Sequence, residues 1–79
     1  MTQEQILDKL ELIFIEQLKL TTLHVGMEQK LSDIRGWDSL TQINIVENIE
    51  SQFNVDFSAG EIVVLKTISD LVKLIQSKI

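Results

Sequence analysis

The first segment of the chain carries apolar residues at helical spacing. They recur at i, i+3, i+7 and i+11 with two neighbours beside them, namely Leu7, Leu10, Phe14 and Leu18 with Ile6 and Ile13. Residues 2–5 have the Thr-x-x-Gln pattern of a capping box, in which two side chains satisfy free N–H groups at a helix start. The pattern predicts a helix over about residues 3–18.

A second apolar stripe begins after residue 38 and predicts a second helix that ends at Phe53. Its members are Leu40, Ile43, Val46, Ile49 and Phe53, and the polar residues between them point more outward. Asp38 is a favoured N-cap residue, and its carboxylate meets the positive end of the helix dipole. The two helices are joined by a long connection over residues 19–37, with apolar anchors at Leu31, Ile34 and Trp37.

Two more capping patterns predict the last helices. Residues 58–61 read Ser-x-x-Glu and lead into the apolar run 62–65, which predicts a short third helix that Gly60 weakens. Residues 67–70 read Thr-x-x-Asp, and apolar residues then recur to the end of the chain. The sequence therefore predicts a single all-α domain over residues 1–79. It is a four-helix bundle with three long helices, one short third helix and a long first loop.

Composition narrows the possible chemistry. Hydrophobic residues make up 44% of the 79, which is enough for a packed core, and the chain has no cysteine and no proline. A disulfide, a thiolate nucleophile and a cysteine zinc site are therefore excluded, and any thioester would need a thiol from outside the polypeptide. The apolar runs are far too short for a membrane span, and the first residues lack a basic secretory start. We expect a cytoplasmic monomer.

The net charge of −5 lies in the middle of the sequence. Residues 31–61 hold six acids and one base, whereas the remainder holds six acids and six bases. Such a region repels nucleic acid and favours basic protein surfaces. It is also compatible with a solvated helix face that binds nothing.

The residues with the strongest chemical implication are Gly36-Trp37-Asp38-Ser39-Leu40, where the long loop enters the second helix. A serine at this place exposes its hydroxyl beside the N–H groups and the dipole of a helix N-terminus, which favour an attached phosphate. On the local sequence alone, the favoured explanation is that Asp38 and Ser39 act as helix caps only.

A resemblance to a known family favours a modified Ser39 over one that only caps the helix. Asp38-Ser39-Leu40 looks like the Asp-Ser-Leu motif of acyl carrier proteins, and residues 40–53 resemble the family's second helix. Phe53-x-Val55-x-Phe57 is similar to the turn that follows it, and residues 65–71 are similar to the start of the family's last helix. The resemblance covers essentially the whole chain and is sharpest from residue 36 to residue 71. It implies an acyl-carrier-like four-helix bundle.

The resemblance implies that a phosphopantetheinyl transferase joins 4'-phosphopantetheine from coenzyme A to Ser39. It also implies that the transferase recognises the neighbouring residues Asp38 and Leu40. The thiol of this arm would carry acyl groups as thioesters in fatty-acid-like or polyketide-like biosynthesis, and the chain itself would not be an enzyme. Acyl-transferring or condensing enzymes with basic surfaces would dock on the second helix at Ile43, Glu47 and Glu50.

The resemblance also implies that the acyl chain enters the bundle. Five residues are candidates for such a pocket, and ordinary core packing is the alternative for each: Val46, Ile49, Phe57, Ile62 and Leu65. No metal site is expected, because the single histidine, His24, has no neighbouring ligand at metal spacing.

Two other functions are weighed against the carrier. A hydrolase would use Ser39, His24 and Asp38, but Asp38 adjoins Ser39 rather than orienting a histidine, and no Gly-x-Ser-x-Gly motif is present. The other is a helical protein-interaction module of the same fold that is never modified, in which Asp38 and Ser39 only cap the helix.

Overall fold

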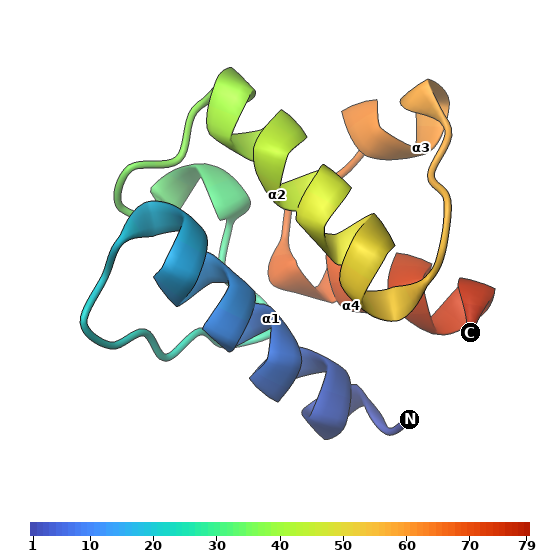
Figure 1. Cartoon of the computed structure of the whole chain (residues 1–79), viewed down its shortest axis with the longest axis horizontal. Coiled ribbons are helices and arrows are strands. Elements are labelled where there is room, and N and C mark those ends of the chain that lie inside the picture. Colours follow the sequence, from blue (N-terminus) through green and yellow to red (C-terminus); the bar gives the residue numbers. More distant parts are fainter.

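The computed structural model describes all 79 residues and is entirely helical (Figure 1). Its elements are α1 (Gln3–Leu18), the 3-10 turn η1 (Leu31–Asp33), α2 (Ser39–Phe53), α3 (Ala59–Val63) and α4 (Ile68–Lys78). The predicted all-α class, with three longer helices, a short third helix and a long first loop, is confirmed. None of these helices has both the length and the apolar character that crossing a membrane requires.

The helix boundaries follow local capping chemistry. Reciprocal capping boxes start α1 at Thr2, α3 at Ser58 and α4 at Thr67, as the sequence predicts. Helices α1 and α2 end where Lys19 and Asn54 adopt left-handed backbone angles, each with φ of 56°. Short-range patterns of this kind can be found from sequence because both partners lie within one helical turn.

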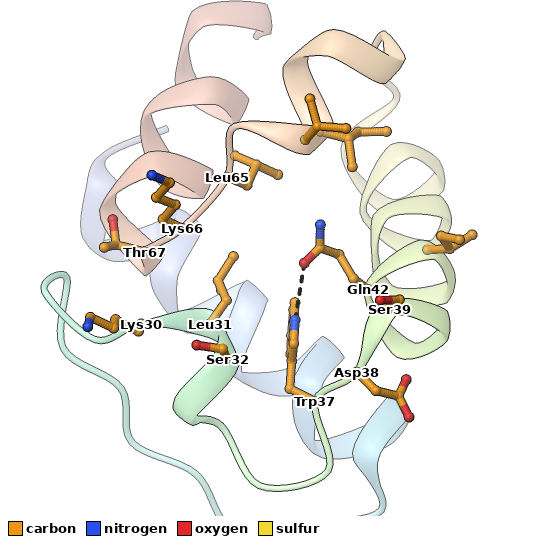
Figure 2. Close-up of a pocket in the computed structure, with 13 residues that line it drawn as sticks. Lys30, Leu31, Ser32, Trp37, Asp38, Ser39, Gln42, Leu65, Lys66 and Thr67 are labelled. Atoms are coloured by element: carbon orange, nitrogen blue, oxygen red, sulfur yellow. Dashed lines mark hydrogen bonds between the residues drawn. The ribbon is translucent and has the colours of Figure 1, made fainter.

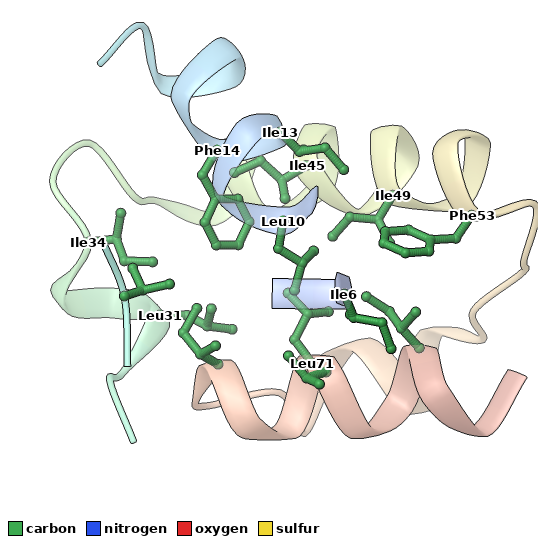
Figure 3. Close-up of a cluster of buried hydrophobic side chains, with 14 of the residues drawn as sticks. Ile6, Leu10, Ile13, Phe14, Leu31, Ile34, Ile45, Ile49, Phe53 and Leu71 are labelled. Atoms are coloured by element: carbon green, nitrogen blue, oxygen red, sulfur yellow. The ribbon is translucent and has the colours of Figure 1, made fainter. Parts of the chain in front are cut away.

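The core lies between α1, α2 and α4 (Figure 3). Helix α1 contributes Ile6, Leu10 and Phe14, which are fully buried. They pack with a row from α2 and with Leu71 and Ile75 of α4, the helix that closes the other side of the cluster. Phe14 is among the largest fully buried side chains, so the centre of the molecule depends on α1.

The inward face of α2 differs from the predicted stripe. Its row in the main core is Ile45, Ile49 and Phe53 at i, i+4 and i+8, and the sequence analysis did not include Ile45 in the stripe. Leu40 and Ile43 are 68% and 53% exposed, so the N-terminal part of the apolar stripe stays uncovered. The reason is geometric, because apolar spacing identifies a stripe but does not show which part of it another element covers.

Helix α3 is short and superficial. It spans five residues, none of which is buried, and Leu65 of the expected run lies beyond its end. Val63 and Val64 are left exposed near its C-terminus. A glycine inside so short a helix lowers its intrinsic stability further.

The long first loop is fastened to the segment between α3 and α4. The N–H of Leu31 donates to the Lys66 carbonyl at 2.9 Å, and the N–H of Ile68 donates to the Gln29 carbonyl at 2.9 Å. The N–H of Ser69 donates to the Met27 carbonyl at 2.8 Å. Loop carbonyls thus satisfy two of the free N–H groups at the start of α4. The expected anchors Leu31 and Ile34 are buried, as is Val25, which the sequence analysis did not single out.

Candidate functional site

Ser39 is the first residue of α2, and its side chain is exposed. Asp38 performs the N-cap, since its Oδ1 accepts the N–H of Thr41 at 2.7 Å. Gly36 has φ of 86°, a left-handed angle that suits glycine, and its carbonyl accepts the Thr41 hydroxyl at 3.3 Å. The cap is therefore made by the neighbouring carboxylate, and the Ser39 hydroxyl remains available for another role.

The Asp38 carboxyl has a pKa below its ordinary value of 3.8, mainly because it accepts the backbone N–H of Thr41. This carboxylate is therefore fully ionised at neutral pH. It places a fixed negative charge beside Ser39 and also meets the positive end of the α2 dipole.

Trp37 connects the start of α2 to the core. Its ring lies edge-on to Phe14, with the ring centroids 5.4 Å apart and the planes at 79°. Its indole Nε1–H donates to Oε1 of Gln42 at 3.2 Å. The expectation that Trp37 anchors the loop is confirmed, and the indole also fixes the side chain of Gln42.

A pocket of about 760 Å³ opens beside Ser39 (Figure 2). It lies between the start of α2, the end of the first loop, α3 and the segment before α4. Its lining is Lys30, Leu31, Ser32, Trp37, Asp38, Ser39, Gln42, Ile43, Ile62, Val63, Leu65, Lys66 and Thr67.

The pocket includes only part of the set proposed for the acyl chain. Ile62 and Leu65 line it, whereas Val46, Ile49 and Phe57 do not. Ile49 belongs to the main core, and Phe57 packs against that core from a partly buried position. Val46 is buried outside the main cluster.

The residues proposed for docking have different surroundings. Leu40, Ile43 and Glu47 are exposed along one side of α2, at i, i+3 and i+7. Glu50 is half-buried, and its Oε2 accepts the N–H of Phe57 at 2.9 Å. Glu50 therefore holds the turn after α2, a role that the sequence analysis missed.

The structure does not assemble the hydrolase arrangement. His24 is 95% exposed, and its Nδ1 lies 3.8 Å from Glu11. No hydrogen bond or ion pair joins it to Ser39 or to Asp38, whose carboxylate caps α2 instead. No group of three His, Cys, Asp or Glu side chains could hold a metal ion.

The polar wall of the pocket was not predicted from the sequence. Gln42 lies one turn after Ser39, so helical periodicity could have identified it as a neighbour. Lys30, Lys66 and Thr67 come from segments far apart in the chain. Their meeting depends on the backbone bonds between the loop and the residues before α4, which leave no local pattern.

Comparison with known proteins decides the family. The family model for the phosphopantetheine attachment site matches residues 8–75. The chain belongs to the acyl carrier protein family. An acyl carrier protein of Thermotoga maritima is 32% identical over 78 residues, which cover 99% of this chain and 96% of that protein. One from Thermosynechococcus vestitus is 29% identical over 79 residues, covering 100% of this chain and 98% of that protein.

Solved structures agree in fold. A crystal structure of an acyl carrier protein from Thermotoga maritima superposes with a TM-score of 0.87 at 22% identity, covering 96% of this chain and 88% of that one. The solution structure of a holo acyl carrier protein from Geobacter metallireducens has a TM-score of 0.82 at 32% identity. The match covers 91% of this chain and 83% of that one.

The prosthetic group of this carrier family is 4'-phosphopantetheine. The start of α2 fits such a group, because it presents an exposed hydroxyl at a helix N-terminus whose N–H groups and dipole favour a phosphate. The family consists of carriers rather than catalysts, and a carrier of this kind interacts with partner enzymes.

Proposed function

We propose that this acyl carrier protein bears its 4'-phosphopantetheine arm on Ser39. The observation that carries the proposal is the exposed Ser39 hydroxyl at the first position of α2, beside the pocket. Ser39 is the central residue of the Asp-Ser-Leu sequence. Asp38, and not Ser39, accepts the N–H that caps the helix. The hydroxyl is free to form a phosphodiester.

The arm supplies a thiol, which a chain without cysteine lacks and which holds acyl groups as thioesters. The polypeptide holds the attachment point at the rigid start of a helix and presents it to partner enzymes. Asp38 and Leu40 flank the serine and would be recognised by the phosphopantetheinyl transferase. On this proposal the chain has no catalytic group of its own.

Partner docking is proposed for the exposed side of α2 that carries Leu40, Ile43 and Glu47. Leu40 and Ile43 would offer apolar contacts near Ser39, and Glu47 would add a negative charge one to two turns further along the helix. The complementary partner surface is basic, as is expected of the transferase and of acyl-transferring or condensing enzymes. Glu50 contributes less than the sequence suggested, because its carboxylate is engaged with Phe57.

Acyl cargo from fatty-acid-like or polyketide-like biosynthesis is proposed to enter the pocket beside Ser39. Ile43, Ile62 and Leu65 give this pocket apolar walls. Val46, Ile49 and Phe57 could join them only if α2 and α3 moved apart. Helix α3 has no buried residue to resist such a movement.

Intact mass spectrometry tests the attachment. The apo protein is incubated with coenzyme A, magnesium and a broad-specificity phosphopantetheinyl transferase. We expect the wild type to gain one phosphopantetheine and Ser39→Ala to gain none. Ser32→Ala is the matched control, because Ser32 is an exposed serine lining the same pocket, and it should be modified like the wild type.

A folded wild-type protein that gains no mass would contradict the proposal. The unmodified interaction module would then be the better description. Circular dichroism of each variant separates this outcome from misfolding.

A further inference from the structure

The side chain of Gln42 has a defined orientation at the wall of the pocket. A tryptophan indole can only donate a hydrogen bond, so the Gln42 atom facing Trp37 must be the amide oxygen. The amide NH2 is therefore on the opposite side. Figure 2 shows this nitrogen turned away from Trp37 and toward the side of the pocket where Leu65 lies.

The orientation is supported from behind. Trp37 is held by its edge-on contact with the buried ring of Phe14. The backbone N–H of Gln42 donates to the Asp38 carbonyl at 2.9 Å in the first turn of α2. A rotation of the amide would leave the indole N–H facing another donor, so the NH2 is kept toward the pocket.

This donor has no acceptor within the chain and faces a partly apolar space. Leu31 and Leu65 lie on the wall across from it. A donor in such a place favours a ligand with a matching acceptor and disfavours one without it.

The charges of the pocket indicate a neutral acceptor. Lys30 and Lys66 also line the pocket, but Figure 2 shows their ammonium groups directed away from Gln42. Asp38 at the other edge is negative. A carboxylate beside Gln42 would thus meet no cation there, whereas a carbonyl oxygen needs only the one N–H.

The distance from Ser39 suits a chain attached to it. Ser39 and Gln42 are three residues apart on one helix, which places their Cβ atoms roughly 5–6 Å apart. A flexible chain linked to the Ser39 hydroxyl can therefore turn directly into the pocket and pass the amide.

We propose that the pocket between α2, the first loop and α3 binds a carbonyl-bearing stretch of the chain carried on Ser39, with Gln42 Nε2 donating to the carbonyl oxygen. This proposal rests on the attachment of the arm to Ser39. The carbonyl has two possible sources: an amide of the arm itself, or an oxo group of an oxidised acyl cargo. If the oxo group is the acceptor, a saturated acyl cargo, which has only the thioester carbonyl that both acyl forms share, places aliphatic carbon beside Gln42 and would be held less well.

Nuclear magnetic resonance of the ¹⁵N-labelled protein tests the contact. The apo form is compared with the holo form, a saturated acyl form and a 3-oxoacyl form of equal length, each verified by mass. The Gln42 side-chain NH2 should shift on conversion to holo if the arm is the source. It should shift only in the 3-oxoacyl form if the cargo is the source.

Internal controls are available in the same spectra. The Asn48 NH2 donates to Gln17 Oε1 at 3.2 Å, does not line the pocket and should stay fixed. Gln42→Glu keeps an acceptor for the indole N–H but removes the donor toward the pocket. In this variant we expect the 3-oxoacyl thioester to be cleaved by hydroxylamine about two- to tenfold faster than in the wild type, if the cargo is the source. The saturated thioester should change little.

An unmoved Gln42 NH2 in all loaded forms would overturn this proposal and leave attachment to Ser39 intact. A shift in the saturated form that is absent from both other loaded forms would overturn it as well. Failure of the folded protein to gain the arm would overturn both proposals, and the mass measurement identifies that case.

Discussion

At the start of α2, two adjacent residues have different roles. Asp38 accepts the Thr41 N–H, and Ser39 is left exposed with its hydroxyl unused. The sequence predicts Asp38 as the N-cap, but its local pattern leaves open that Ser39 is only a cap as well, because serine and aspartate are both good caps. The structure separates them, since the first helical residue is Ser39 and the cap is therefore the residue before it.

We predict that stability in acid depends on three carboxylates at helix starts. Asp38, Glu61 and Asp70 have pKa values below their ordinary values of 3.8, 4.5 and 3.8, with backbone N–H groups of Thr41, Ser58 and Lys66 as the respective leading causes. Near pH 4 the folded state therefore binds fewer protons than the unfolded state. Stability should be level at higher pH and should fall as the pH drops below about 4.5.

Urea unfolding followed by circular dichroism at pH 7 and pH 3.5 measures this loss. Asp70→Asn keeps an oxygen acceptor for the Lys66 and Thr67 N–H groups but cannot titrate. The variant should lose less stability between the two pH values than the wild type. Equal losses would show that Asp70 does not contribute to the acid sensitivity.

The helices could be predicted from the sequence, but the faces that other helices cover could not. The capping patterns at Thr2, Ser58 and Thr67 act within one turn, so the sequence contains all their partners. The exposure of Leu40 and Ile43 depends on what α1 and α4 leave uncovered. The pocket wall depends on backbone pairing between the loop and the residues before α4, which involves residues distant in sequence.

Helix α3 is the element whose stability is easiest to change without touching the core. Nothing lies within 4 Å of a Cβ built on Gly60, so an added methyl group meets open space. Gly60→Ala should stabilise α3 by roughly 1 kcal/mol through helix propensity. Hydrogen exchange of the α3 amides should slow, whereas exchange in α1 should follow only the change in global stability.

Gly26→Ala is the matched control, since its Cβ also meets no atom within 4 Å and Gly26 lies in the first loop. This substitution should leave α3 exchange as it is in the wild type. If Gly60→Ala failed to slow exchange in α3, the exchange there would be limited by something other than helix propensity.

The excess negative charge and the proposed attachment site belong to the same part of the structure. Glu47 is exposed on the same side of α2 as Leu40, which is the residue next to Ser39. The lysines near the pocket, Lys30 and Lys66, come from outside the acidic segment. A basic partner would therefore be attracted along α2 rather than over the pocket mouth.

Charge reversal on α2 tests this arrangement. Glu47→Lys should slow phosphopantetheinyl transfer by about two- to fivefold at low salt, because one attractive contact becomes repulsive. The difference from the wild type should shrink as salt screens the interaction. Asp8→Lys makes the same change of net charge at an exposed site on α1 and should have a smaller effect. Equal slowing by both variants would indicate a general charge effect without a docking face.

The two ends of the chain meet away from the attachment site. The Gln3 side chain donates to Gln76 Oε1 at 3.3 Å, and Figure 1 shows both termini at one end of the molecule, while α2 begins at the other. A second protein fused to either terminus would project away from Ser39. Two carriers joined in tandem, or one inserted into a surface loop of a larger enzyme, could thus present their arms without mutual obstruction.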